Sequence, residues 1–176
     1  MIRLGTALLS IALVIPPAAA AGQEAPDLGQ VLRDFGLRSN VDGLDLLVVH
    51  LNDKTTDALF EAPAKYSFRA QARQVTMFYV LGTPDRPVTV TTDFRIRQEA
   101  IDVRFTPHSL SNFEEGTEVG PGETFSGILA LNQILSLRIP FSIVSPPASC
   151  GAENRRGCHV FEFEFTPNIL SQLDAP

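Results

Sequence analysis

The last third of the chain constrains the fold most strongly, because two alternating segments flank a polar loop there. Apolar residues occupy every second position over residues 135–143, and the same alternation returns over residues 161–165. A period of two is typical of strands that bury one face. We therefore predict a β-hairpin over residues 135–165. Pro140 cannot donate a ladder hydrogen bond, so its strand is expected at a sheet edge or with a bulge.

The loop of this hairpin is bounded by Cys150 and Cys158, the only two cysteines in the chain, with seven residues between them. Two lone cysteines in an exported chain favour a disulfide, and closing so short a loop would stabilise the fold by about 2.5 kcal/mol. The alternatives with a specific chemical function are a redox pair and a metal-thiolate site. The spacing does not match C-x-x-C, however, and His159 is merely adjacent to the second cysteine. The disulfide between Cys150 and Cys158 is the only site predicted, with no catalytic, cofactor-binding or metal-binding residue.

The N-terminus has the pattern of a secretory signal. Arg3 supplies a positive charge, residues 4–15 form an apolar run, and four alanines follow at residues 18–21. The apolar run is shorter than the roughly 20 residues that a membrane-spanning helix needs. We predict that residues 1–21 are a signal peptide and that the protein is periplasmic or secreted. An uncleaved N-terminal anchor remains the alternative.

Composition limits the class of partner. The net charge is −6, and the longest basic run is the dipeptide Arg155-Arg156. Nucleic acids and anionic membranes call for a concentrated basic face, so both are disfavoured. We expect another envelope protein as the partner, no cofactor, and a membrane contact only if the N-terminal segment is retained as an anchor.

A short helix is predicted before the first strand. Asp27 can cap it, apolar residues recur with helical spacing over residues 28–35, and Gly36 provides a C-terminal stop. We assign residues 22–43 to a leader with this short helix. Residues 44–176 are assigned to a single β-sandwich domain.

The strand pattern predicts the fold class. About seven strands separated by turn signals, with no long helix between them, indicate an all-β, immunoglobulin-like antiparallel β-sandwich. A closed barrel is the alternative. Residues 53–64 remain ambiguous, and residues 106–122 resemble a long polar connection. Besides the hairpin, the expected strands cover residues 44–51, 73–81, 88–97, 101–105 and 124–131.

No known catalytic motif occurs in the sequence. There is no G-x-S-x-G elbow, Gly-rich phosphate loop or H-E-x-x-H. Glu114 and Glu115 are consecutive in a polar segment, which predicts a solvated loop tip. The pattern therefore indicates a protein that is not an enzyme, although a hydrolase with a site not visible in the sequence, for instance near His108, remains open.

The three histidines are His50, His108 and His159, and none has a metal-ligand spacing such as H-x-x-x-H. His50 continues an apolar strand face, so we expect a partly buried, hydrogen-bonded ring. A copper or other metal carrier that uses Cys150, Cys158 and His159 remains a second alternative; it requires free thiols.

Several segments occur in a familiar order, and together they span residues 60–131. They resemble the immunoglobulin-like domain of the copper-delivery factors that assemble cytochrome c oxidase. Those factors bind copper through a C-F-C-F motif shortly before a P-G-E turn, and Leu110–Phe113 stands in that place here without a thiol. The resemblance therefore implies a sandwich fold and an accessory role, without the copper site. The segments are Phe60-Glu61-Ala62, Arg73-Gln74-Val75, Phe78-Tyr79-Val80, the run from Thr83 to Thr89, Phe94 and Pro121-Gly122-Glu123.

The sequence as a whole predicts an exported, non-enzymatic β-sandwich that acts by binding, as an accessory or assembly factor of the cell envelope. Binding residues concentrate on the loops of a rigid scaffold. The candidate surfaces are therefore the loop at residues 106–120 and the loop between the cysteines, residues 151–157.

Overall fold

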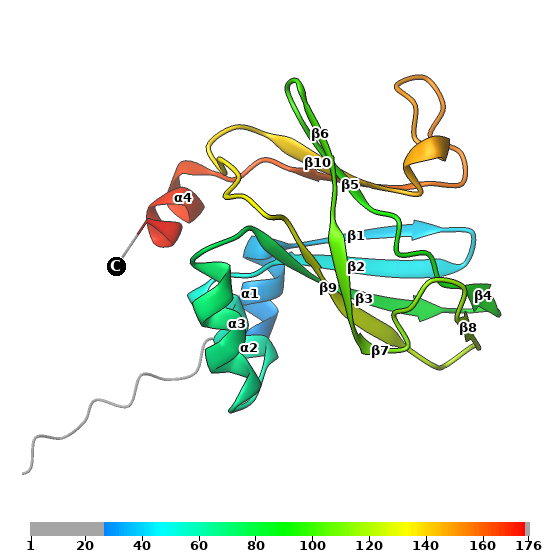
Figure 1. Cartoon of the computed structure of the whole chain (residues 1–176), viewed down its shortest axis with the longest axis horizontal. Helices are drawn as coiled ribbons and strands as arrows, with labels where there is room; N and C mark the ends of the chain where they lie inside the picture. Colours follow the sequence, from blue (N-terminus) through cyan, green and yellow to red (C-terminus); the bar gives the residue numbers. More distant parts are fainter. Residues whose placement is uncertain (1–26, 175–176) are drawn as a thin grey trace, which may run out of the picture.

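The computed structural model describes residues 27–174, and the predicted signal peptide at residues 1–21 lies outside the described residues. The described chain is mostly β-strand and forms antiparallel sheets, consistent with a β-sandwich (Figure 1). Eleven strand segments occur in these residues, two of them only two residues long, against the roughly seven expected.

A five-stranded antiparallel sheet forms the middle of the molecule. Strand β3 lies at its centre, and β1 and β7 form its edges. In spatial order the strands are β1 (Gly36–Val41), β2 (Leu44–His50), β3 (Met77–Pro84), β9 (Phe125–Ala130) and β7 (Thr106–Ser111).

A four-stranded antiparallel sheet packs on one face of the five-stranded sheet, and a two-stranded sheet lies beside them. The order of the four-stranded sheet is β11 (His159–Phe163), β10 (Phe141–Ser145), β5 (Arg95–Gln98) and β6 (Ile101–Arg104). The two-stranded sheet pairs β4 (Val88–Thr89) with β8 (Glu118–Val119).

Helices cover the other face of the five-stranded sheet. Val31 and Phe35 pack there against Leu47 and Val49 of β2. The molecule therefore has three layers, and only two of them were expected. The helices are α1 (Leu28–Phe35), α2 (Asp53–Leu59) and α3 (Ala64–Ala72) in this layer, α4 (Pro167–Leu173) after β11, and the 3₁₀ turn η1 (Pro147–Ser149).

The central strand β3 contributes to both layers of the core. Phe78 and Val80 point between the two sheets, whereas Met77 and Tyr79 point toward the helices. This alternation confirms the expectation that the segment is a central strand with two buried faces. The strand begins later than expected because α3 and a turn occupy the residues before Met77.

The predicted N-terminal helix is confirmed as α1. The Asp27 carboxylate accepts a hydrogen bond from the Gly29 amide at 3.1 Å, as an N-cap does. The helix ends at Phe35, and Gly36 then begins β1. The short helix therefore leads directly into an edge strand of the sandwich, within the segment that the sequence assigned to the leader.

The ambiguous segment at residues 53–64 contains the helix α2, and a second helix, α3, begins at its last residue. Asn52 caps α2 through a reciprocal capping box with Thr55. Phe60, between α2 and α3, packs against Phe68 with ring centroids 4.6 Å apart and ring planes inclined by 44°. The sequence signal was weak because α3 has no buried residue, so its apolar spacing does not stand out.

The predicted hairpin forms by the pairing of β10 with β11. The expected strand at residues 135–143 was partly wrong, because the strand begins only at Phe141, directly after Pro140. Strand β10 lies between β5 and β11 and is not an edge. The preceding loop is held by Gln98, whose side-chain amide donates to the carbonyl oxygens of Ser136 at 2.8 Å and Ile139 at 2.7 Å.

The expected polar connection at residues 106–122 contains the strands β7 and β8, so that expectation was wrong. Strand β7 is an edge strand whose side chains are mostly exposed. Its polar sequence therefore carries no burial signal, and its backbone pairing with β9 defines it. The expected strand at residues 88–97 is divided into β4 and β5, because Val90 pairs instead with the backbone of Gly116 and Thr117.

The two ends of the sandwich differ in construction. We call the end that carries α1, α2, α3 and α4 the helix end; it lies on the left of Figure 1. We call the opposite end the loop end; it carries the β1–β2 turn, β4, β8 and the loop that contains η1 (Figure 1). Among residues 27–174, no helix combines the length and apolar character needed to cross a membrane.

Candidate binding cavity at the loop end

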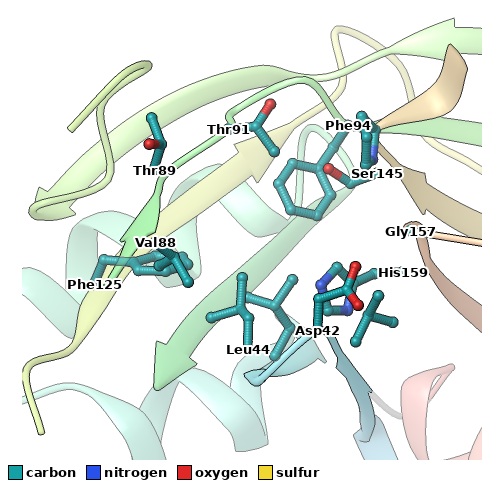
Figure 2. Close-up of a pocket in the computed structure, with 13 residues that line it drawn as sticks. Asp42, Leu44, Val88, Thr89, Thr91, Phe94, Phe125, Ser145, Gly157 and His159 are labelled. Atoms are coloured by element: carbon teal, nitrogen blue, oxygen red, sulfur yellow. The ribbon is translucent and has the colours of Figure 1, made fainter. Parts of the chain in front are cut away.

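A cavity of about 180 Å³ opens at the loop end (Figure 2). We call it the end cavity. Its residues come from both sheets, from β4 and from the loop that contains the cysteines. The apolar part of the wall is formed by Val41, Leu44, Leu46, Val88, Phe94 and Phe125, and the polar side chains are Asp42, Thr89, Thr91, Ser145 and His159.

The apolar side chains of the cavity wall lie on strand faces that point toward the core between the sheets. Leu46 and Phe125 belong to the buried core between the sheets, and Leu44 and Val88 pack against that core while remaining partly exposed. Figure 2 draws Val88 and Phe125 on the side of the cavity opposite Asp42 and His159. The cavity is therefore an extension of the hydrophobic core toward solvent.

Ser145 and His159 are directly opposite each other on β10 and β11, on the face that points between the sheets. The Ser145 hydroxyl is buried, and its Oγ has no hydrogen-bond partner. The His159 ring lies with Nδ1 3.3 Å from Ser39 Oγ of β1. An imidazole has two ring nitrogens, so Nε2 is left for another partner.

The protonation of His159 depends on opposing effects. Burial lowers the pKa of His159, while the nearby Asp42 and Asp45 carboxylates and the Ser39 backbone act in the opposite direction. The net direction is downward from the ordinary value of 6.5. The ring is therefore neutral at pH 7 and has one nitrogen that accepts a hydrogen bond.

Asp42 lies in the turn between β1 and β2. Asp42 and Gly43 both have positive φ angles, 51° and 77°, a conformation that aspartate and glycine tolerate better than most residues. The turn is held by Arg86, whose Nε donates to the Asp42 carbonyl oxygen at 2.8 Å, and by the Asp85 amide, which donates to the Gly43 carbonyl at 2.8 Å. The backbone thus fixes the turn, and among residues 27–174 no cationic side chain forms an ion pair with the Asp42 carboxylate.

The predicted cysteine pair lies beside the end cavity, on the other face of the sheet. Cys150 and Cys158 share a buried cluster with Val144 and Val160. Both are free thiols in the structure, so the disulfide remains a prediction. Burial, reinforced by the neighbouring Cys158 thiol, raises the pKa of Cys150 to about 12. Such a thiol is a weak nucleophile, which disfavours the redox alternative.

The proposed metal ligands are not brought together. The His159 ring faces the space between the sheets, whereas both cysteines pack on the opposite face with Val144. Within residues 27–174, no three His, Cys, Asp or Glu side chains form a group that could hold a metal ion. The structure therefore does not favour a carrier site built from Cys150, Cys158 and His159.

The other two histidines lie outside the end cavity. His50 is buried at the helix end, where its ring packs against Phe78 and Phe165 with centroids 5.4 and 5.9 Å away. Its Nδ1 has no hydrogen-bond partner, so the expected hydrogen-bonded ring was wrong in that respect. His108 is exposed on the edge strand β7, which removes the motivation for a hydrolytic site around it.

Glu115 has a structural contact that the expectation of a solvated tip missed. Its Oε2 accepts hydrogen bonds from the Thr92 amide at 2.6 Å and from the Thr92 hydroxyl at 2.8 Å. These bonds lower the pKa of the Glu115 carboxyl. Glu115 therefore fastens the 114–117 loop to the segment between β4 and β5.

A larger groove of about 1530 Å³ lies at the helix end, between α4 and the helices α1–α3. Its charged side chains are extensively paired with one another. Arg73 pairs with Asp53, Arg69 with Asp57, and Arg138 with Asp174. Several charges of the groove therefore have a partner, whereas the Asp42 carboxylate of the end cavity forms no ion pair with the described residues.

The end cavity holds the residue types of a serine hydrolase without the hydrogen bonds of one. Activation of a serine requires a base within hydrogen-bond reach of its hydroxyl. Ser145 Oγ has no hydrogen-bond partner, and His159 Nδ1 faces Ser39 instead of a carboxylate. The arrangement can donate and accept hydrogen bonds, and no base is hydrogen-bonded to Ser145 Oγ.

Comparison of the chain with known protein families, curated proteins and solved structures found no match.

Proposed function

We propose that this chain is an exported, non-enzymatic β-sandwich that binds another component of the cell envelope, and that it binds through the end cavity. The construction of the cavity carries the proposal. Six apolar side chains and five polar side chains surround a space of about 180 Å³. A pre-formed, mostly apolar hollow with a few oriented polar groups is typical of binding sites.

The absence of a base bonded to the Ser145 hydroxyl favours a binding role over catalysis. The Ser145 hydroxyl has no base bonded to it, and it is only 1% exposed. We expect an activity-based fluorophosphonate probe to leave Ser145 unlabelled under conditions that label a serine hydrolase. Labelling of Ser145 that His159→Phe abolishes would contradict the non-enzymatic proposal.

The proposal includes an immunoglobulin-like class for the sandwich and an accessory or assembly role. The sheets support this class because the chain alternates between them, from β3 to the β5–β6 hairpin and from β9 to the β10–β11 hairpin. The resemblance of residues 60–131 to the copper-delivery factors supports the role. The lack of thiols at Leu110–Phe113 favours a role without Cu(I).

The disulfide between Cys150 and Cys158 belongs to the same proposal. The two cysteines lie in one buried cluster, and the loop that they bound contributes Gly157 to the cavity wall. A bond between them would hold this part of the wall in an oxidising compartment.

The test uses one blocking variant and one matched control. Val88 lines the end cavity, whereas Val103 is 38% exposed on β6 and does not line it. Envelope extracts are passed over the immobilised full chain as wild type, Val88→Trp and Val103→Trp, after thermal unfolding has checked that each is folded. We expect a component retained by the wild type and by Val103→Trp, and lost with Val88→Trp. Retention of the same components by all three proteins, or of none by the wild type, would overturn the proposal.

A further inference from the structure

The charge on the wall of the end cavity has one sign. Asp42 is the one carboxylate among the residues that line it, and no lysine or arginine lines it. The nearest guanidinium on the turn, that of Arg86, donates its Nε to the Asp42 carbonyl and not to the carboxylate. An anionic ligand would therefore meet a negative charge without a cation to balance it, whereas a cation would find an unpaired carboxylate.

Several side chains that can accept hydrogen bonds line the end cavity. They are the Asp42 carboxylate, the Thr89 and Thr91 hydroxyls, the His159 ring, and the Ser145 Oγ, which is buried without a partner. A primary ammonium group has three N–H donors. The cavity wall therefore carries enough acceptor groups for the three donors of an ammonium group.

The volume of the end cavity limits the size of the apolar group that a bound ammonium compound can carry. The end cavity holds about 180 Å³, and a buried apolar cavity of about 150 Å³ is known to take up benzene. A ring of six carbons with a short linker, or a branched aliphatic group of similar volume, fits this space. Phe94 and Phe125 supply aromatic surface against which such a group can pack.

We propose that the end cavity recognises a primary ammonium group attached to a small apolar group, with the Asp42 carboxylate at its mouth as the charged partner. The inference rests on the proposed function, since it names the ligand chemistry of the same cavity. Two sources carry this chemistry: a free apolar amine, and the N-terminus of a polypeptide whose first residue is apolar.

The experiment titrates the full chain with probes that share a phenyl group and a two-carbon linker. The probes are 2-phenylethylamine, 2-phenylethanol and 3-phenylpropionate, and binding is measured by isothermal titration calorimetry at pH 7 and low salt. A charge-assisted hydrogen bond adds about a tenfold preference at an exposed site. We expect the amine to bind at least about tenfold more tightly than either of the other probes.

Two variants distinguish the effect of the Asp42 carboxylate on amine binding from the effect of the overall negative charge at the loop end. Asp42→Asn keeps a residue that tolerates the positive φ of 51°, so the turn is preserved while the charge is lost. Glu153→Gln removes the same charge from the exposed loop between the cysteines, outside the cavity wall. We expect Asp42→Asn to weaken amine binding about tenfold and to leave 2-phenylethanol unchanged, whereas Glu153→Gln leaves both unchanged.

Peptides distinguish the two sources. The peptide Phe-Ala-Gly amide is compared with its N-acetylated form and with 2-phenylethylamine. Tighter binding of the free peptide than of the amine assigns the site to a polypeptide N-terminus, and the reverse order assigns it to a free amine. Equal binding of the acetylated and free peptides contradicts recognition of the ammonium group.

The failure of this inference can be told from failure of the proposed function. If 2-phenylethanol binds as tightly as the amine, and Val88→Trp abolishes both, the cavity is a binding site but the ammonium assignment is wrong. If none of the three probes binds, the inference is overturned, and the extract experiment with Val88→Trp and Val103→Trp decides the proposed function by itself.

Discussion

The two ends of the sandwich each contain a buried histidine, and the surroundings of these two rings differ. His50 at the helix end and His159 at the loop end are 6% and 7% exposed, so burial does not distinguish them. His50 lies against Phe78 and Phe165, and burial lowers the pKa of His50 to about 4 with no charged group among the causes. His159 instead has Ser39 and Asp42 beside it and faces a cavity.

This difference teaches that a buried histidine alone does not indicate a site. At the helix end, His50 packs against Phe78 and Phe165 and also borders the groove, and the residue contributes packing and a pH-dependent stability. At the loop end, the space between the sheets is left partly open, and the Ser145 hydroxyl, which has no hydrogen-bond partner, lies on its wall. Stability and binding are therefore assigned to opposite ends of one core.

The largest loss of stability is expected from a substitution in the densely packed part of the core. Phe78 is fully buried, and its ring contacts Phe105, Phe141 and Phe163 at centroid distances of 5.7, 5.8 and 5.3 Å. Phe78→Ala should lower the free energy of unfolding by about 4 kcal/mol, measured by urea denaturation. Val88→Ala, on the cavity wall, should cost less than about 1 kcal/mol because little packing is lost there. Equal losses would show that the loop end is packed as tightly as the helix end.

The second effect is a loss of stability in acid that comes from His50. Its folded-state pKa of about 4 is below the ordinary value of 6.5, so the unfolded chain binds a proton more readily. The stabilisation is therefore complete above pH 6.5 and is lost as the pH falls toward 4, by about 3 kcal/mol.

Urea denaturation between pH 7 and pH 4 measures this dependence, and the matched variant is His50→Phe. The variant keeps a planar ring between Phe78 and Phe165 and has no proton to bind. We expect its unfolding free energy to fall much less over this range. If the wild type and His50→Phe have the same pH slope, carboxyl groups and not His50 cause the acid sensitivity.

A third effect concerns the cysteines at the loop end. Mass spectrometry of the exported protein should give a mass lower by two hydrogens than that of the reduced chain, as one disulfide requires. Reduction should then lower the free energy of unfolding by about 2.5 kcal/mol. The double variant Cys150→Ser, Cys158→Ser should match the reduced protein and lose no further stability on treatment with reductant. A full-mass exported protein would exclude the disulfide.

The smallest effect is a gain in stability at the cavity wall. Ser145 Oγ is buried without a hydrogen-bond partner, and such a group costs free energy when it leaves water. Ser145→Ala should therefore raise the free energy of unfolding by about 1 kcal/mol, measured by thermal or urea denaturation. Ser142→Ala, on the same strand, is the matched control and should have little effect. A loss of stability in Ser145→Ala would mean that the hydroxyl is bonded in the folded protein.

The sandwich itself could be predicted from the sequence because its core strands follow period two. The hairpin at β10 and β11, the cap at Asp27 and the two-sided strand β3 all follow local rules and are found in the structure. In the helical layer α1 was predicted, whereas α3 was missed because it has no buried residue. The edge strand β7 was missed because its polar side chains face outward, and only backbone pairing with β9 identifies it.

The candidate site could be predicted only in part. The cysteine loop, residues 151–157, was singled out from the sequence, and Gly157 at its end lines the cavity. Ser145 and Asp42 carried no signal because they come from separate strands and turns. Their proximity to His159 depends on the cross-strand pairing of β10 with β11 and on the approach of β1, and long-range pairing of this kind is not encoded in local spacing.

The claim that the loop end is the binding end is tested most directly by titrating the full chain with 2-phenylethylamine and following the backbone amide resonances by NMR. We predict saturable shifts at the residues around the end cavity, including Asp42, Ser145 and His159, and unchanged resonances at His50 and its neighbours. Shifts centred on the groove at the helix end, or no saturable shifts at the loop end, would contradict the account.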